Sequence, residues 1–80
     1  MPKQANITTL DTSGLSCPMP MVKLNQAIKK VSPDGLLEVI ATDRGALTDI
    51  PSWCNRMGHV LIESNSDNGT YNFLIRRIVG

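Results

Sequence analysis

The sequence is poor in aromatic residues and in net charge. It has 1 tryptophan, 1 tyrosine and 1 phenylalanine among 80 residues, and 8 basic against 7 acidic side chains give a formal net charge of +1. A surface that binds nucleic acid usually combines a basic field with aromatic side chains on which bases stack. Because this chain is short of both, no direct nucleic-acid partner is expected.

Long apolar runs and clustered cysteines are also missing. No apolar run approaches the length needed to span a bilayer, and residues 1–6 lack the apolar core of a signal peptide. The 2 cysteines stand far apart, unlike the dense framework of a small secreted protein. We therefore expect a cytoplasmic protein with reduced thiols and no attachment to a membrane.

Hydrophobic periodicity divides the chain into short elements of a single domain spanning residues 1–80, of which residues 1–5 are expected to be flexible. Apolar residues at helical spacing predict amphipathic helices, and short apolar runs bounded by turn residues predict strands. The predicted elements are a strand at 7–10, a helix at 18–31, a strand at 36–42, a helix after 43–45, a strand at 59–64 and a strand at 70–79.

Turn residues define the connections between these elements. Asn68-Gly69 is the two-residue signal of a tight hairpin, and Gly58 suits the left-handed end of the second helix. Pro51 leaves the start of that helix open, because it either lies in the first turn with Thr48 as the cap or kinks or divides the helix. The order βαβαββ predicts an α+β fold, a two-layer α/β sandwich in which a mixed four-stranded sheet carries both helices on one face.

Cys17 begins the sequence Cys-Pro-Met-Pro, the strongest local signal in the chain. Pro18 suits the first helical position, and the residue before a proline is pushed out of the α region. The cysteine is therefore expected to be the N-cap, exposed near the positive end of the helix dipole, where a thiolate is stabilised. The alternative is a free cysteine packed under a turn. The polar approach through Ser13, Gly14 and Ser16 favours exposure.

Two longer segments contain the rest of the pattern. Residues 10–20 read LDTSGLSCPMP, and residues 49–54 read DIPSWC, with Gly58-His59 shortly after. Together they resemble the TusA-like (SirA-like) sulfur-carrier family over nearly the whole chain. The resemblance implies that Cys17 is the catalytic, sulfur-carrying residue, supported by the motif residues Gly14, Leu15, Pro18 and Pro20.

The same resemblance implies a cytosolic protein that accepts a sulfane sulfur as a persulfide on Cys17 and relays it to a protein acceptor thiol. It implies a donor protein of the cysteine desulfurase or rhodanese type, in tRNA thiolation, molybdenum-cofactor metabolism or sulfur oxidation. Persulfide relay is exchange between thiolates and sulfur–sulfur bonds, so no metal or other cofactor is expected. The sequence sets no oligomeric state and leaves open whether such a carrier counts as an enzyme.

Several side chains near the motif have both a functional and a structural interpretation. Met19 is expected on the surface as part of a docking area. Lys23 and Arg44 are the charged candidates for the same docking area. They would favour an anionic persulfide or an acidic partner, although surface charges of this kind often only interact with solvent. Cys54 lies on the apolar stripe of the second helix and is expected to be buried, so that Cys54→Ser should leave sulfur loading intact.

Four further residues are assigned structural roles. Asp11 and Asp49 are expected to make a turn and to cap a helix. His59 is expected to be structural or solvated at a helix-to-strand corner, and Trp53 to lie in the core or an interface. The dispersed cysteines and single histidine do not supply a zinc ligand set.

Two functional alternatives remain open. A thiosulfate-handling sulfurtransferase would use Cys17 to attack a small anion and would need a basic cleft, for which Lys23 and Arg44 are the candidates. A non-catalytic RNA-binding or regulatory module would fit a βαβαββ sandwich, but the near-neutral charge argues against it.

Overall fold

The computed structural model describes residues 7–79, so the residues predicted to be flexible, 1–5, lie outside the described range. Within this range the chain has the predicted order βαβαββ. Neither helix in residues 7–79 is long and apolar enough to cross a membrane. The elements are β1 (Ile7–Thr12), α1 (Met19–Ile28), β2 (Leu36–Ala41), α2 (Ala46–Met57), β3 (Val60–Asp67) and β4 (Thr70–Arg76).

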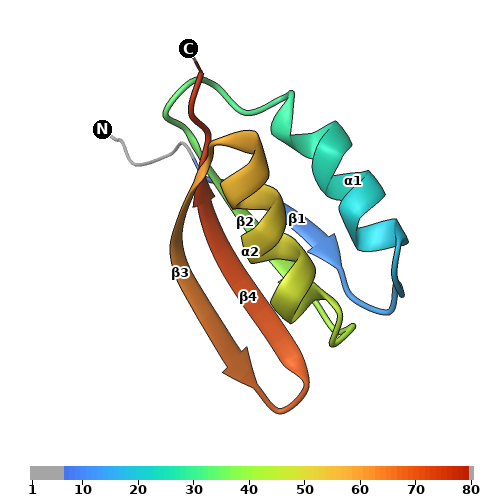
Figure 1. Cartoon of the computed structure of the whole chain (residues 1–80). Helices are drawn as coiled ribbons and strands as arrows, with labels where there is room; N and C mark the ends of the chain where they lie inside the picture. Colours follow the sequence, from blue (N-terminus) through green and yellow to red (C-terminus); the bar gives the residue numbers. More distant parts are fainter. Residues whose placement is uncertain (1–6, 80) are drawn as a thin grey trace.

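The strands of the described region form one mixed sheet in the order β1-β2-β4-β3. β1 is parallel to β2, with Ile7 opposite Leu36 and Thr12 opposite Ala41, and β4 is antiparallel to both of its neighbours. Both helices lie on the same face of the sheet (Figure 1). This confirms the predicted two-layer sandwich, which follows from the parallel pair because a right-handed crossover places α1 on that face.

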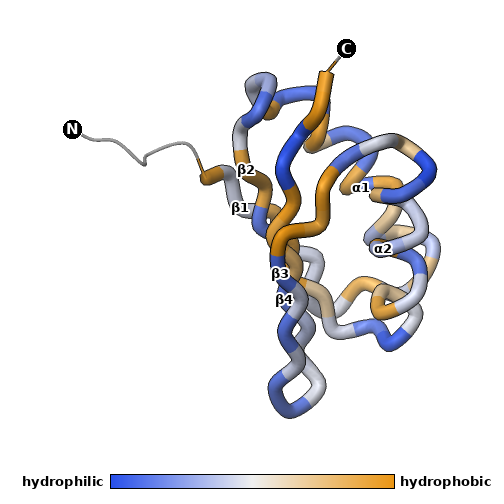
Figure 2. The backbone as a smooth tube through the Cα atoms, turned by 60° about the vertical axis from the view of Figure 1, so that its left-hand side comes forward, coloured by the Kyte–Doolittle hydropathy of each residue, from blue (hydrophilic) through white to orange (hydrophobic). Residues whose placement is uncertain are grey.

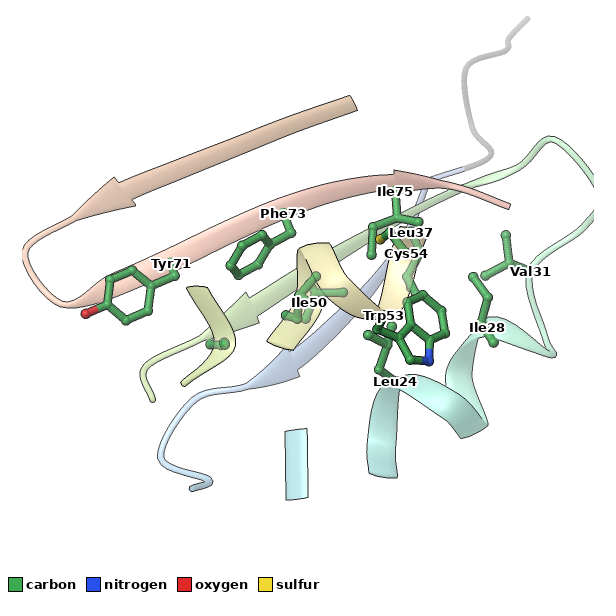
Figure 3. Close-up of a cluster of buried hydrophobic side chains, with 13 residues drawn as sticks. Leu24, Ile28, Val31, Leu37, Ile50, Trp53, Cys54, Tyr71, Phe73 and Ile75 are labelled. Atoms are coloured by element: carbon green, nitrogen blue, oxygen red, sulfur yellow. The ribbon is translucent and has the colours of Figure 1, made fainter. Parts of the chain in front are cut away.

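The core lies between the helices and the covered face of the sheet. Along β2 and β4 every second residue is buried, which is the period of strands with one covered face. Trp53 of α2 is 1 % exposed and lies beside Leu24 of α1 (Figure 3), so both helices contribute to one core. The buried apolar residues are Leu24, Ile28, Val31, Leu37, Val39, Ala41, Ala46, Ile50, Trp53, Cys54, Tyr71, Phe73 and Ile75.

The connection between β3 and β4 is the predicted tight turn. Asn68 and Gly69 have φ angles of 51° and 84°, the left-handed pair that a type I′ hairpin turn requires. The end of this hairpin is hydrophilic and extends beyond the helices (Figure 2). The edge strand β3 is exposed along most of its length, and polar side chains fill its last half, residues 64–67.

α1 is shorter than the predicted helix at 18–31. Its last residue is Ile28, after which the N–H groups of Lys30 and Val31 bond to carbonyls three residues back and tighten the chain into a turn. The Arg77 guanidinium donates to the carbonyl of Lys29, the C-cap of α1, and to that of Val31, and so holds this turn in place. Val31 is buried nonetheless, which explains why its apolar side chain fits the helical spacing.

α2 begins directly after residues 43–45, as predicted, so Pro51 does not lie in its first turn. It starts at Ala46 and continues as one helix through Pro51, which lies inside it. Gly45 rather than Thr48 is the N-cap, and Oδ2 of Asp43 accepts the Gly45 N–H at 3.1 Å. Gly58 ends α2 with a φ of 80°, as predicted. The start of α2 therefore follows β2 closely.

The strand ends also differ from the prediction. β1 continues to Thr12, whose buried hydroxyl donates to the Ile40 carbonyl at 2.6 Å and ties β1 to β2. β3 begins at Val60 and continues to Asp67, while β4 ends at Arg76. These differences of a few residues leave the topology unchanged.

Candidate functional site

The two helices begin at the same edge of the sheet. α1 follows the carboxyl end of β1 and α2 follows that of β2, and these ends lie together because the two strands are parallel neighbours (Figure 1). The loop before α1 is tied to the chain after β2, since the Gly14 N–H donates to the Thr42 hydroxyl at 2.8 Å. The first residues of both helices are therefore brought close together.

Cys17 lies where this loop meets α1. Its side chain is exposed and its thiol is free, as predicted. The approach is a tight turn in which the Leu15 N–H donates to the Thr12 carbonyl at 3.1 Å. Gly14 has a φ of 82°, in the region that favours glycine. The Cys17–Pro18 peptide bond is cis. A hydrogen-bonded loop thus holds the thiol at the surface.

The N-cap of α1 is Pro18, so the prediction that Cys17 caps the helix is wrong. The N–H groups of the first turn are also engaged. Met19 donates to a loop carbonyl at 2.9 Å, Met21 donates to the Pro18 carbonyl at 3.1 Å, and Pro20 has no N–H. Since no N–H of this turn remains for a thiolate on the preceding cysteine, the expected stabilisation by the helix N-terminus does not arise.

A carboxylate faces the sulfur instead. The Cys17 thiol donates a hydrogen bond to Oδ2 of Asp49, with 3.6 Å between sulfur and oxygen. Partial desolvation, this hydrogen bond and the negative charges of Asp49 and Asp43 raise the pKa of the Cys17 thiol. This shift is opposite in direction to the thiolate stabilisation that the sequence predicted.

The predicted cations do not determine the charge at the sulfur. Lys23 and Arg44 are exposed, and among residues 7–79 the charged groups that act on the Cys17 thiol are Asp49 and Asp43. Lys23 and Arg44 are not among the groups that shift the pKa of the Cys17 thiol. Their role toward an anionic persulfide or an acidic partner stays a prediction.

The motif residues divide into exposed and anchoring ones. Met19, two residues after Cys17, is 41 % exposed, as expected of a surface side chain. Pro20 is buried and Leu15 is half-buried, so each anchors one side of the exposed thiol. Met21 packs against the core, which was the structural alternative for that residue.

The two aspartates of the pattern have different roles. Oδ1 of Asp11 accepts the Ser13 N–H at 2.9 Å, which makes the predicted turn, and hydrogen bonds from Ser13 lower the pKa of Asp11. Asp49 does not cap α2, because it lies after the Gly45 cap and its carboxylate accepts the Cys17 thiol. Sequence reasoning missed this contact, although a parallel strand pair places both helix starts at one edge.

Cys54 and His59 have structural roles, as predicted. Cys54 is 2 % exposed, and burial raises the pKa of its thiol to about 11. Nδ1 of His59 accepts the Ile78 N–H at 3.0 Å, and its ring lies 5.1 Å from that of Trp53, centroid to centroid. Cys17 is therefore the one exposed free thiol among residues 7–79.

The fold and the site define a small α/β sandwich that presents one exposed, free thiol where two helix N-termini converge. The chain belongs to the sulfurtransferase TusA family, whose sequence model matches residues 8–77. This confirms the resemblance found in the sequence.

Two relatives support this assignment, and one solved structure supports the fold. The chain is 44% identical over 68 residues to the sulfur carrier protein TusA of Pseudomonas putida strain F1, covering 85% of each chain. It is also 44% identical over 68 residues to that of Pseudomonas aeruginosa strain PAO1, covering 85% of this chain and 86% of the relative. A SirA-like protein from Desulfitobacterium hafniense has the same fold, with a TM-score of 0.75 at 23% identity, covering 91% of this chain and 99% of that one.

Proposed function

We propose that this protein is a sulfur carrier that holds a sulfane sulfur as a persulfide on Cys17 and passes it to the thiol of an acceptor protein. The observation that carries the proposal is the exposed, free thiol of Cys17 at the start of α1, inside the segment that matches the TusA family. The relatives named sulfur carrier protein TusA cover most of this chain and support the same activity.

The transfer needs only sulfur exchange. The ionised Cys17 sulfur attacks the outer sulfur of a donor persulfide, a new sulfur–sulfur bond forms, and the donor's own sulfur–sulfur bond breaks to release the donor thiolate. The acceptor thiolate then attacks the outer sulfur on Cys17 and releases the cysteine thiolate. Each step conserves sulfur and electrons, and the proton of the attacking thiol ends on the departing one.

The position of the second cysteine supports a carrier rather than a dithiol oxidoreductase. Cys54 is buried in the core, and its thiol has a pKa of about 11 because of burial. A resolving cysteine has to be ionised and within reach to turn a persulfide into an internal disulfide. A persulfide on Cys17 is therefore kept until another protein takes it.

The acidic surroundings of the thiol favour protein partners over a small anion. Partial desolvation, and then Asp49 and Asp43, raise the pKa of the Cys17 thiol, and the same carboxylates repel a dianion such as thiosulfate. We propose a persulfide donor of the cysteine desulfurase or rhodanese type in the cytosol, docking near the exposed Met19, with Lys23 and Arg44 as further candidate contacts.

Mass spectrometry tests the proposal directly. The wild-type chain, incubated with a cysteine desulfurase and free cysteine, should gain about 32 Da, the mass of one sulfur atom. Cys17→Ala should abolish the gain, and Cys54→Ala is the matched control that should keep it. A gain that persists in Cys17→Ala, or no gain in the wild type with any persulfide donor, would refute the carrier function.

A further inference from the structure

The acceptor of the Cys17 hydrogen bond comes from the other helix. Asp49 lies in the first turn of α2, and its own N–H already bonds to the Gly45 carbonyl at 2.9 Å. Gly45 leaves room for the carboxylates of Asp49 and Asp43 because it has no side chain. A Cβ at that position would lie 3.6 Å from Oδ2 of Asp49 and 2.8 Å from Oδ2 of Asp43. Both carboxylates therefore lie on the side of Gly45 that faces the site.

We propose that Asp49 restrains the sulfur carrier: its carboxylate holds the unloaded Cys17 thiol in a hydrogen bond toward α2 and releases it when a sulfur is added. This inference rests on the proposed function of Cys17. It assigns to Asp49 a role in the transfer itself, in place of the helix capping that its sequence position suggests.

In the unloaded protein the Asp49 carboxylate favours keeping the proton on the Cys17 thiol. Ionising Cys17 would place two negative charges in contact at the 3.6 Å that separates sulfur and oxygen. The pKa of the thiol is raised by partial desolvation, then by the hydrogen bond and charge of Asp49, and then by Asp43. The engaged N–H groups of the first turn of α1 offer no compensation. A protonated thiol is a weak nucleophile, so the free carrier reacts slowly with small oxidants and electrophiles.

In the loaded protein the hydrogen bond no longer exists. The inner sulfur of a persulfide is bonded to Cβ and to the outer sulfur and has no proton to donate. The outer sulfur, when it is an anion, is repelled by the Asp49 carboxylate. The carboxylate therefore directs the transferable atom away from α2 and toward solvent, where an acceptor thiolate can reach it.

Alkylation kinetics test the restraint. In a Cys54→Ala background, the rate at which iodoacetamide modifies Cys17 should rise at least about twofold at neutral pH in Asp49→Asn, since the amide keeps the shape and removes the charge. The inflection of the rate against pH should also move to lower pH. Asp67→Asn, in the exposed hairpin, removes the same charge from a residue that is not among those acting on the Cys17 thiol, and should match the parent rate.

A second measurement uses the chain without a change at Asp49. The carbon-13 resonance of the Asp49 carboxylate should shift when Cys17 is loaded with sulfur, while that of Asp67 stays constant. Two results would overturn the inference: an unchanged or slower alkylation rate in Asp49→Asn, or an Asp49 carboxylate resonance that stays constant when Cys17 is loaded with sulfur. The proposed function stands or fails separately, because it depends on whether the wild-type chain gains sulfur from a donor.

Discussion

Asn25→Ala tests the contact that holds α1 against α2, the two helices whose first turns form the site. Nε1–H of Trp53 donates to Oδ1 of Asn25 at 2.9 Å. The indole is 1 % exposed, so water has little access to the N–H while the helices are packed. Deleting the acceptor should therefore leave a buried donor without a partner.

The expected loss of stability follows from two opposing effects. An unpaired buried N–H costs about 1–3 kcal/mol. Alanine is a better helix former than asparagine by about 0.6 kcal/mol, which offsets part of this cost. The free energy of unfolding should thus fall by about 0.5–2.5 kcal/mol, and at about 4–8 °C per kcal/mol for a domain of this size Tm should fall by about 2–20 °C.

The assay is urea and thermal unfolding followed by circular dichroism, with Trp53 fluorescence as a second probe. Gln26→Ala is the matched control, since Gln26 is the exposed neighbour on the same helix and should leave Tm nearly unchanged. Equal Tm values for Asn25→Ala and Gln26→Ala would refute the reasoning, because they would show that water or a rearrangement satisfies the indole N–H at no cost.

Two further predictions concern the residues assigned structural roles. Cys54→Ala should keep sulfur loading on Cys17 while the free energy of unfolding falls by about 1 kcal/mol, because a small buried group is removed from the core; a folded variant that no longer loads would contradict this. For His59, burial and then the charge of Arg77 lower the pKa of the imidazole below its ordinary 6.5, and Nδ1 must be unprotonated to accept the Ile78 N–H. Since the unfolded chain then binds the proton more readily, the stability from His59 is present above about pH 6.5 and is lost as the pH falls below it. The urea midpoint should accordingly drop between about pH 7.5 and about pH 5.5 in the wild type and less in His59→Gln; an equal drop in both would assign the effect to other groups.

Local sequence patterns predicted most of the fold because most of its elements satisfy local rules. Asn68-Gly69 and Gly58 adopt the left-handed conformations that their residue types favour. The errors lie where tertiary contacts override local rules. α2 continues through Pro51 because Ile50 and Trp53 on either side of it are buried, and their packing outweighs one missing helical hydrogen bond.

The site shows the same division between local and non-local effects. The exposure of Cys17 was predictable because the loop, the prolines and the turn are all contiguous with it. The raised pKa of its thiol was not, because after desolvation the next causes are the hydrogen bond and charge of Asp49, 32 positions away in the sequence. An aspartate in the first turn of a helix already satisfies a local rule, since it opposes the positive end of the helix dipole, and a search by local rules stops there.

The topology adds what this search misses: two parallel neighbouring strands, each followed by a helix, must bring the first turns of those helices to one edge. In a sheet of this order, an acidic residue in the first turn of the second helix should therefore be considered first as a partner of the motif cysteine, and only then as a cap.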